Sequence, residues 1–568
     1  MNLFPSSKPS LTYVSCFVNI NCKEPHKTHS WRMDNFRQIA KTGVPIVLYV
    51  DAEIKEAFDW TQFSNVVLKD VDYSKSWTYK VCGLYKGNLP ASRNMVKDSF
   101  LFLCLMNMKI EFVVNAVNEN PFDTQHFAWI DFNLTHIFKR KEATCNYMKF
   151  LSTCKWKPRF IANPGCWEKG QGMESIVDNI NWRFCGGFMI GDGQSFLELF
   201  DLYLEHFTIF MHRYRHITWE VNFWAWLEAN AGWEIVWFKA DHDDSIVRIP
   251  SHLFSRCIAD ETGMATVRYP FPEKPGFYPS SSSYIHFDNE HILNVRYVNY
   301  KLDECGRYHI NHPSGHLETL NLRCYLTEDL NEFREEPEFM WEGMIGLREY
   351  DKSIKGLEDV RLFVSGNQLK YIATNKSYHV MQKIRMIMGD YSASMAMFEN
   401  GRVLEPPTDT YCEKNWIPIS KNQFIYRWSP FEIGELEGDA LKIVKSVPVE
   451  QLITIRGSTP PVWSEKDQCH YCVVHYCEHV HGAKTLAYYH MLVKLDKDFI
   501  PFEWSNVFHF NRVGIQYCIG FTILDEGFAF WFSEHDGNPG FLRIYTGEDL
   551  KWDTPQGCHF KSLPIPRH

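Results

Sequence analysis

Residues Ala128–Asn133 read AWIDFN and decide how the first half of the chain folds. The apolar residues have the composition of a buried β-strand, and the polar residues Asp131 and Asn133 follow at its end. Ligands of α/β proteins bind beyond the carboxyl ends of strands, where Mg²⁺ or Mn²⁺ is commonly held by one or two carboxylates together with phosphates. The stretch therefore predicts a strand whose end offers Asp131 and Asn133 as ligands of a divalent cation.

The sequence around this stretch, from residue 1 to about 250, alternates between strand-like and helix-like segments. Thr12–Ile20 and Val44–Ala52 are apolar runs of buried-strand length, whereas Phe196–Arg213 and Glu220–Ala231 have helical spacing. This alternation predicts an α/β domain over residues 1–250. Because Asp51 also stands at the end of a strand, it is a further candidate for ligand binding.

Three motifs follow downstream: RFCGGF (Arg183–Phe188), TWEVNFW (Thr218–Trp224) and ADHDD (Ala240–Asp244). Together with Asp131 they have the order that a nucleotide-sugar glycosyltransferase needs, and they predict Mn²⁺ or Mg²⁺ as cofactor. Gly186 and Gly187 would let backbone approach the donor sugar. Glu220 would be the catalytic group that faces the acceptor, and His242 would complete the metal shell begun by Asp131 and Asn133. Asp51 and Asn222 are the remaining candidates for donor binding.

Each of these residues also has a structural alternative, which the sequence leaves open. Asp131 is of a residue type that often forms turns, and Glu220 would interact favourably with the N-terminus of its own helix. Gly186 and Gly187 would equally serve a tight turn, and His242 would equally belong to a solvated acidic loop.

Composition excludes several classes of protein. The 568 residues carry a formal net charge of −10 with no basic block, which gives nucleic-acid binding no electrostatic support. No run approaches the roughly 18–20 apolar residues of a membrane span, and the first twenty residues lack a leader pattern. The 17 cysteines are scattered, which is typical of reduced thiols. We therefore expect a cytoplasmic chain without a transmembrane segment.

The composition and the spacing of apolar residues change after residue 250. Pro, Gly and Ser concentrate in residues 251–283, which predicts a linker. From residue 284 to 568 helical spacing disappears and aromatic strands recur. Five of them resemble the central strand of a repeated unit: Ile292–Tyr300, Gly356–Thr374, Asn422–Pro430, Cys469–His479 and Gly527–Asp536. This repetition predicts a five-bladed β-propeller with a central pocket.

The N-terminal region resembles the HtrL/YibB family of glycosyltransferase-like proteins. The resemblance covers roughly residues 10–250 and rests on YVDAEI, FAWIDFN, RFCGGFMIGD, TWEVNFWAWLE and ADHDDSIV. It implies a GT-A-like fold that uses a nucleotide sugar. Asp131 and Asn133 would take the metal–diphosphate role, Glu220 would act on the acceptor, and His242 or Asp244 would complete the site. Asn133 stands where many GT-A enzymes have a second Asp.

The C-terminal region resembles the five-bladed propellers of mannoside phosphorylases and related mannosyltransferases. The matching pieces are LEDVRLF, EKNWIPI, IRGSTPPVW, VVHYCEH, YHMLVKLD and FSEHD. The resemblance implies that Asp359 is the catalytic acid, although Val360 replaces the usual proline beside it. It further implies that the residues binding phosphate or sugar are Arg361, Arg456, His475 and Asp536.

These observations together predict a bifunctional glycosyltransferase that builds consecutive linkages of a glycan. The N-terminal domain would transfer from a nucleotide-sugar donor, and the propeller would make a second, mannosyl-type transfer. Two alternatives remain open: a single active transferase with a glycan-binding propeller, and a non-enzymatic scaffold for partner proteins.

Overall fold

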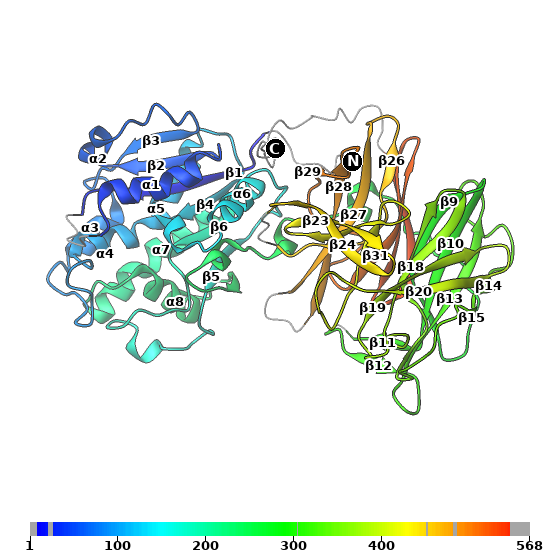
Figure 1. Ribbon diagram of the computed structural model, residues 1–568. Coiled ribbons are helices and arrows are strands. Elements are labelled where there is room, and N and C mark those ends of the chain that lie inside the picture. Colours follow the sequence, from blue (N-terminus) through cyan, green and yellow to red (C-terminus); the bar gives the residue numbers. More distant parts are fainter. Residues whose placement is uncertain (1–7, 21–25, 304, 450–452, 481–484, 546–568) are drawn as a thin grey trace. The chain divides into compact units, whose positions relative to one another are not determined.

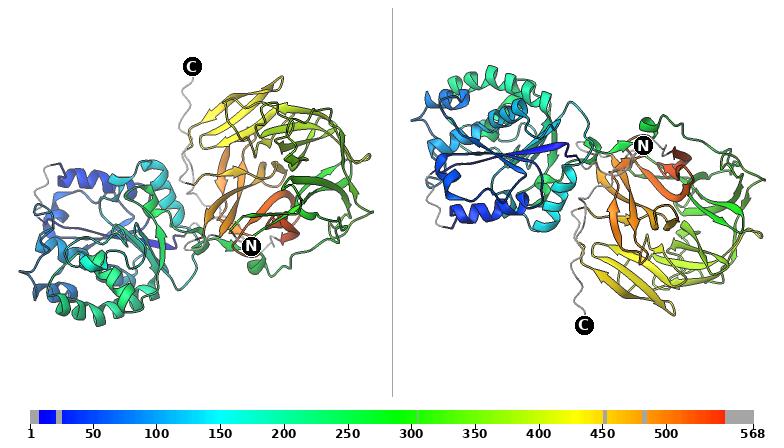
Figure 2. Two further views of the ribbon diagram at one scale, coloured as in Figure 1. Left: turned by 90° about the horizontal axis from the view of Figure 1, so that it is seen from below. Right: turned by 90° about the horizontal axis from the view of Figure 1, so that it is seen from above.

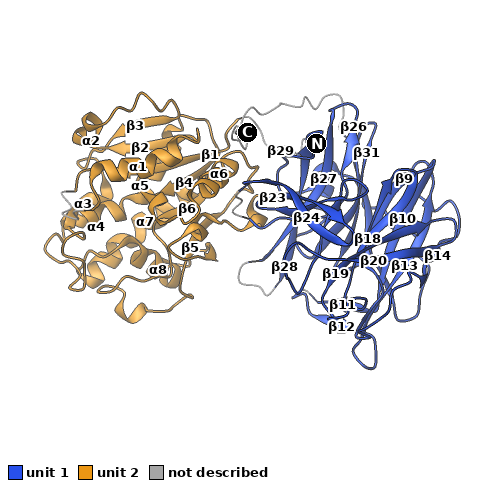
Figure 3. Ribbon diagram, viewed as in Figure 1, with its two compact units in different colours: residues 1–5, 255–568 blue, residues 6–254 orange. Residues whose placement is uncertain are grey.

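The computed structural model (Figure 1) describes residues 8–20, 26–303, 305–449, 453–480 and 485–545. They divide into two compact units, one of residues 6–254 and one that begins at Ser255 (Figure 3). The first seven residues of the chain, and the last part of the expected propeller up to residue 568, lie outside the described residues.

A seven-stranded mixed sheet forms the centre of the first unit, with the order β3-β2-β1-β4-β6-β5-β7. Paired neighbours run parallel, except that β6 is antiparallel to both β4 and β5. The strands are β1 (Leu11–Phe17), β2 (Ile46–Val50), β3 (Val66–Asp70), β4 (His126–Ile130), β5 (Ile161–Gly165), β6 (Phe188–Asp192) and β7 (Val236–Lys239). The predicted α/β class of this region is confirmed.

Helices cover both faces of this sheet, which explains why its central strands are apolar on both sides. On β1, the Tyr13 hydroxyl donates to the carbonyl of Met148 in α6, whereas the next residue, Val14, belongs to the core cluster that contains α5. The helices are α1 (His29–Ala40), α2 (Ala52–Ala57), α3 (Trp77–Gly83), α4 (Phe100–Asn107), α5 (Lys109–Glu119), α6 (Lys141–Leu151), α7 (Gly193–Tyr214) and α8 (Glu220–Asn230). Short 3₁₀ turns are η1 (Leu134–Ile137), η2 (Met173–Ser175), η3 (Asp244–Val247) and η4 (Ser251–Leu253).

No single described helix has the length and apolar composition to cross a membrane. The bent pair α4 and α5 passes that test only when the two helices are taken together, across a 45° bend.

The second unit consists of β-sheets in a propeller-like arrangement (Figure 2). Four sheets of its described residues have four or more strands. The first contains β9 (Tyr278–Phe287), β10 (Glu290–Val298), β13 (Leu317–Leu326), β14 (Glu338–Phe339) and β16 (Ile354–Lys355). The second contains β15 (Trp341–Met344), β17 (Glu358–Ser365), β18 (Gln368–Asn375), β19 (Arg385–Ser392) and β20 (Met397–Leu404). The third contains β21 (Ile417–Pro418), β22 (Gln423–Trp428), β23 (Phe431–Glu437) and β24 (Ala440–Val447). The fourth contains β8 (Arg256–Cys257), β25 (Arg456–Gly457), β26 (Val462–Ser464), β27 (Cys469–His479), β28 (Leu486–Leu495), β29 (Pro501–Trp504) and β30 (Phe508–His509).

The described residues thus give four such blades rather than the five predicted. The remaining long strands, β31 (Gln516–Leu524), β32 (Gly527–Glu534) and β33 (Gly537–Tyr545), form a sheet of three. The segment that would supply a fourth strand touches this sheet through one isolated bridge, Val267 with Phe541. A two-stranded ribbon, β11 (Tyr300–Leu302) with β12 (Tyr308–Ile310), accompanies the blades.

The segment predicted as a linker, residues 251–283, is largely built into the second unit. Arg256 in β8 pairs with Phe508 in β30, and α9 (Ile258–Thr262) begins with a fully buried isoleucine. Ser280–Ser283 are buried inside β9. Gly520 lies close against this strand, since a Cβ there would be 2.6 Å from the Ser282 carbonyl oxygen. The serine-rich composition therefore marks a tightly packed strand.

Candidate functional sites

A cavity of about 780 Å³ lies in the first unit, beyond the ends of β1 and β4. Its lining includes six of the residues that the sequence suggested: Asp131, Asn133, Gly186, Gly187, Glu220 and His242. Asp131 is the first residue after β4, and its amide donates to the Gly187 carbonyl at 3.0 Å. This bond joins two motifs that are more than fifty residues apart in the sequence.

The cavity wall also contains Lys109, which the sequence reasoning missed. Its ammonium lies 2.9 Å from Asp131 Oδ1 and donates to Glu220 Oε1 and to the Gly186 carbonyl, both at 2.8 Å. Burial alone lowers the pKa of Lys109, but the two carboxylates outweigh this effect and raise the pKa above its usual value. Lys109 is therefore a charged group that holds three of the predicted segments together.

Asp131 faces the cavity with part of its carboxylate. Its side chain is 39% exposed, and Oδ1 also accepts a hydrogen bond from the Trp129 indole at 3.0 Å. Asn133 lines the same cavity, with its side-chain amide 3.4 Å from His136 Nδ1. Carboxylate and amide oxygens suit Mn²⁺ or Mg²⁺, so these two residues fit the predicted cation. His242 lines the cavity as well; its imidazole lies 3.8 Å from Asp241 and packs edge-on against Trp182.

Glu220 begins α8 and is 4% exposed. The neighbouring glycine is required by this side chain: a Cβ at Gly186 would lie 2.2 Å from Glu220 Oε1. A Cβ at Gly187 would meet Leu134 at 3.2 Å and Ile246 at 3.3 Å, which is a milder conflict. The two glycines thus permit the close packing of the cavity wall.

Three residues named by the sequence reasoning have structural contacts outside the cavity lining. Asp51 caps α2 by accepting from the Ile54 amide at 2.8 Å, and its other oxygen accepts from the Asn19 amide at 2.6 Å. Asn222 is fully buried and binds loop atoms, including the Asn181 amide at 2.7 Å. Asp244 accepts from the backbone amides of Lys139 and Arg140 and from the Thr144 hydroxyl, before and within α6.

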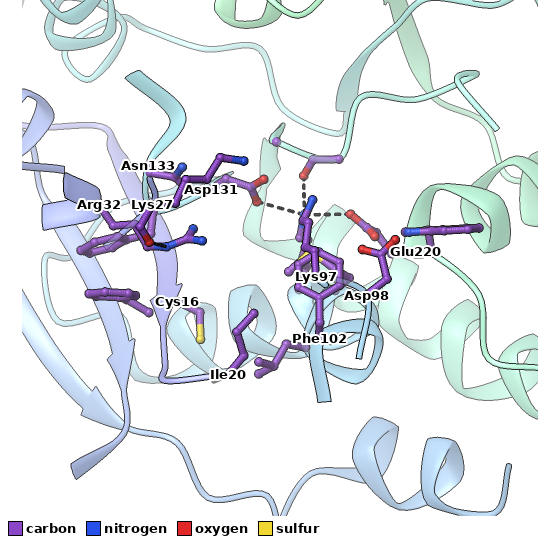
Figure 4. Close-up of a pocket in the computed structure, with 18 of the residues that line it drawn as sticks. Cys16, Ile20, Lys27, Arg32, Lys97, Asp98, Phe102, Asp131, Asn133 and Glu220 are labelled. Atoms are coloured by element: carbon purple, nitrogen blue, oxygen red, sulfur yellow. Dashed lines mark hydrogen bonds and ion pairs between the residues drawn. The ribbon is translucent and has the colours of Figure 1, made fainter. Parts of the chain in front are cut away.

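Cationic side chains add a feature that the motifs did not indicate. Lys27, Arg32 and Lys97 line the cavity, and Figure 4 shows them around it with Asp131 and Glu220. The Lys97 ammonium lies 4.7 Å from the centre of the Phe102 ring. Because these residues come from loops and from α1, no local motif marks them. They give the cavity groups that pair with phosphate oxygens.

The second unit has a smaller cavity of about 190 Å³, lined by charged residues and tyrosines. Four of the five residues suggested for this region line it: Asp359, Arg456, His475 and Asp536. The other lining residues are Arg296, Tyr300, Tyr308, Leu317, Glu358, Lys414, Asn415, Tyr488 and Tyr517.

Arg296 organises the acidic side of this cavity. Its guanidinium donates to Asp359 Oδ1 at 3.0 Å and lies 3.7 Å from Glu358. The Tyr300 hydroxyl donates to Asp536 Oδ2 at 2.9 Å. Burial raises the pKa of the Asp536 carboxyl, whereas the charge of Arg296 acts in the opposite direction. Asp536 is therefore placed in surroundings that favour a protonated carboxyl.

A left-handed backbone conformation orients the side chains of both Asp359 and Asp536. Asp359 has φ 52° and Asp536 has φ 51°, the left-handed region that Asp and Asn tolerate better than most residues. Asp359 lies at an irregularity in the pairing of β17 with β18, between Glu358 and Arg361. Such bulges redirect side chains, here into the cavity.

Arg361 and His475 support the cavity wall through Ser458. Arg361 is fully buried and does not belong to the lining; it donates to the Ser458 carbonyl at 2.7 Å, to Asn415 at 3.0 Å and to the Tyr517 hydroxyl at 2.7 Å. His475 Nδ1 lies 2.7 Å from the Ser458 hydroxyl, and burial lowers the pKa of His475 well below its usual value. The imidazole is therefore neutral near pH 7.

Solved structures of carbohydrate-active enzymes are similar to part of this chain. A β-1,2-mannobiose phosphorylase from Listeria innocua is 10% identical, with a TM-score of 0.33, and the match covers 50% of this chain and 97% of that one. A structure described within the mannoside phosphorylase family, with glycoside hydrolases that target β-1,2 mannosidic linkages in Candida mannan, is 10% identical with a TM-score of 0.34, covering 50% and 94%. A GDP-Man-dependent mannosyltransferase from Leishmania mexicana is 8% identical with a TM-score of 0.32, covering 50% and 92%.

No curated protein matches the sequence. One family model does: HtrL/YibB, described as a bacterial protein of unknown function, matches residues 94–217. The matched range contains Lys109, Asp131 and the two glycines, and ends before Glu220 and His242. The resemblance to this family is thus confirmed for residues 94–217.

Proposed function

We propose that the first unit is a glycosyltransferase that uses a nucleotide-sugar donor, with a GT-A-like fold. The observation that carries the proposal is the 780 Å³ cavity at the strand ends, which combines Asp131 and Asn133 with the cations Lys27, Arg32 and Lys97. Cavities of roughly 300–1,000 Å³ hold ligands of this size. Basic side chains and a carboxylate–amide pair are the groups that bind a diphosphate directly and through a cation.

In this proposal Asp131 and Asn133 would hold Mn²⁺ or Mg²⁺, which neutralises charge on a departing diphosphate when bound. Lys109 fixes the Asp131 and Glu220 carboxylates at 2.9 and 2.8 Å from one ammonium. Glu220 would orient the acceptor hydroxyl from this fixed position, since a positioned catalytic group must stay within hydrogen-bond reach of its substrate. The acceptor would be a glycan.

The test is a donor screen on the full chain: thermal shift and donor hydrolysis with UDP-, GDP- and CMP-sugars, with and without Mn²⁺. We expect a response to one donor that Asp131→Ala abolishes. Asp201→Ala is the matched control, because Asp201 is an exposed aspartate on α7 outside the cavity lining. Absence of any donor response in the wild type would overturn the proposal and favour a scaffold.

A second function is proposed for the other unit, where Asp359 and Asp536 face one cavity with Arg296, Lys414 and Arg456. A pair of carboxyl groups, one of them with a raised pKa as at Asp536, is the arrangement that glycosyl chemistry uses for proton donation. The cations would bind a phosphate or an anionic leaving group. We propose that this cavity carries a second, mannosyl-type transfer.

Asp359→Asn tests this second proposal. Loss of one product from mannoside substrates, with glycan binding retained, would support catalysis. If every product is unchanged, the unit binds glycan without catalysis, and if no glycan binds, the carbohydrate role of this cavity is refuted.

A further inference from the structure

A group of ligand atoms of mixed chemistry lies at the edge of the first unit's cavity. Single atoms of Cys166 (sulfur), Asp241 (carboxylate) and His242 (imidazole) all lie within 4.8 Å of one another. Among the described residues this is the only such group of three or more His, Cys, Asp or Glu side chains. His242 also lines the cavity, so the group borders the proposed donor site.

The sheet places these residues together without help from a ligand. Cys166 directly follows β5, and Asp241 and His242 follow β7 after one residue. The two strands run parallel, with Gly165 opposite Lys239, and the Ala240 amide donates to the Gly165 carbonyl at 2.8 Å. Because the strands end side by side, the three side chains emerge at the same point of the sheet edge.

The distances within the group suit a small transition metal. His242 Nδ1 and Asp241 Oδ1 are 3.8 Å apart. Ligand atoms bound to one tetrahedral zinc at about 2.0–2.3 Å are separated by about 3.3–3.8 Å. A second thiol, Cys185 Sγ, lies 3.7 Å from Cys166 Sγ but outside the group of three.

We propose that Cys166, Asp241 and His242 form a binding site for a zinc-class transition metal. Thiolate and imidazole ligands select such metals over Mg²⁺ and Mn²⁺, which prefer oxygen. The site is therefore chemically distinct from the oxygen ligands Asp131 and Asn133. Its metal fixes His242, whose ring packs edge-on to Trp182 at 4.7 Å, and both residues line the cavity. The bound metal thus holds His242 in place in the cavity wall.

The test is a titration of the reduced, chelator-treated full chain with Co²⁺ and Zn²⁺. We expect a thiolate-to-cobalt charge-transfer band that saturates at one ion per chain and disappears when Zn²⁺ displaces Co²⁺. Cys166→Ser and His242→Ala should weaken binding by about tenfold or more. Cys145→Ser and His212→Ala are matched controls that should bind as the wild type does, since a buried thiol on α6 and a histidine on α7 lie outside the group.

Asp241→Asn provides a variant at an exposed position, in case a cysteine substitution disturbs folding. It should lower affinity while leaving the melting temperature in chelator unchanged. The proposal is overturned if no charge-transfer band forms, if the band persists in Cys166→Ser, or if Cys166 and Cys185 form a disulfide and the reduced chain binds no metal. None of these readouts depends on glycosyl transfer, so failure of the proposed enzymatic function would leave the result interpretable.

Discussion

Replacing Lys109 by methionine should destabilise the first unit more than any other single change to the cavity wall. The ammonium is 1% exposed and contacts two carboxylates and a backbone carbonyl. Methionine fills a similar volume without the charge, so the substitution removes the electrostatic contribution and leaves the packing nearly intact.

The magnitude follows from the burial of the two partners. Removing one member of a buried ion pair costs about 3–5 kcal/mol because the other charge is left uncompensated. The Asp131 side chain is 39% exposed and can regain water, whereas the Glu220 side chain is 6% exposed and cannot. We therefore expect the lower end, about 3 kcal/mol, with most of it arising at Glu220.

A double-mutant cycle in the full chain measures this. Hydrogen-exchange mass spectrometry at increasing urea reports the free energy of unfolding for peptides of α5 and α8, in Lys109→Met, Glu220→Gln and the double variant. Because Glu220→Gln removes the stranded charge, the double variant should be more stable than the sum of the single effects predicts, by about 2 kcal/mol. A single Lys109→Met effect below about 1 kcal/mol, or simple additivity, would refute the reasoning.

Three further predictions concern other contacts. Gly186→Ala should push the Glu220 carboxylate away from Lys109, because the new Cβ would lie 2.2 Å from Glu220 Oε1. Hydrogen exchange should show that the free energy of unfolding of the α8 peptide falls by about 1–3 kcal/mol. An unchanged free energy for α8 would contradict this prediction. Arg361→Met should lower the unfolding free energy of the second unit by about 3 kcal/mol or more, since its buried guanidinium donates to four partners. Arg456→Met, at an exposed cavity position, should weaken glycan or phosphate affinity and leave the melting temperature unchanged, and equal effects of the two variants on stability would refute the distinction. Burial lowers the pKa of His490 to about 3, so below about pH 6.5 the unfolded chain binds a proton that the folded chain does not, and stability falls. His490→Phe should remove roughly 2–3 kcal/mol of the stability loss between pH 7 and 4.5. An unchanged pH profile of urea unfolding would exclude His490 as the cause of that loss.

The sequence predicted what is local to a strand or helix. β4, α7 and α8 begin and end within a few residues of the predicted limits, and β27 coincides with Cys469–His479. Residues that immediately follow a strand, such as Asp131, were found because strand ends share one edge of a sheet. Composition was less reliable: the serine-rich segment predicted as a linker contains β9, whose serines are buried.

Lys109 shows why most of the cavity wall could not be predicted. It is the first residue of α5 and follows an apolar helix, where a lysine ordinarily marks an exposed helix end. Only the packing of α5 against β4 and α7 turns it inward, between an aspartate 22 residues away and a glutamate 111 residues away. The sequence motifs contain the two carboxylates, but they do not include Lys109, the positive charge that pairs with both.

The second cavity also depends on a buried cation whose partners lie far away in the sequence. Arg296 lies inside β10 between apolar residues, and local pattern reading assigns such a position to a strand core. Its partner Asp359 is 63 residues away, and the pair Tyr300 and Asp536 spans 236 residues. A buried guanidinium needs acceptors, which are carboxylates at Arg296, so the positions of these acids and of Arg296 depend on one another. The pairing of buried acids with buried cations therefore depends on how the blades pack together. A search for catalytic residues in such a chain should look for the buried cation together with the acid.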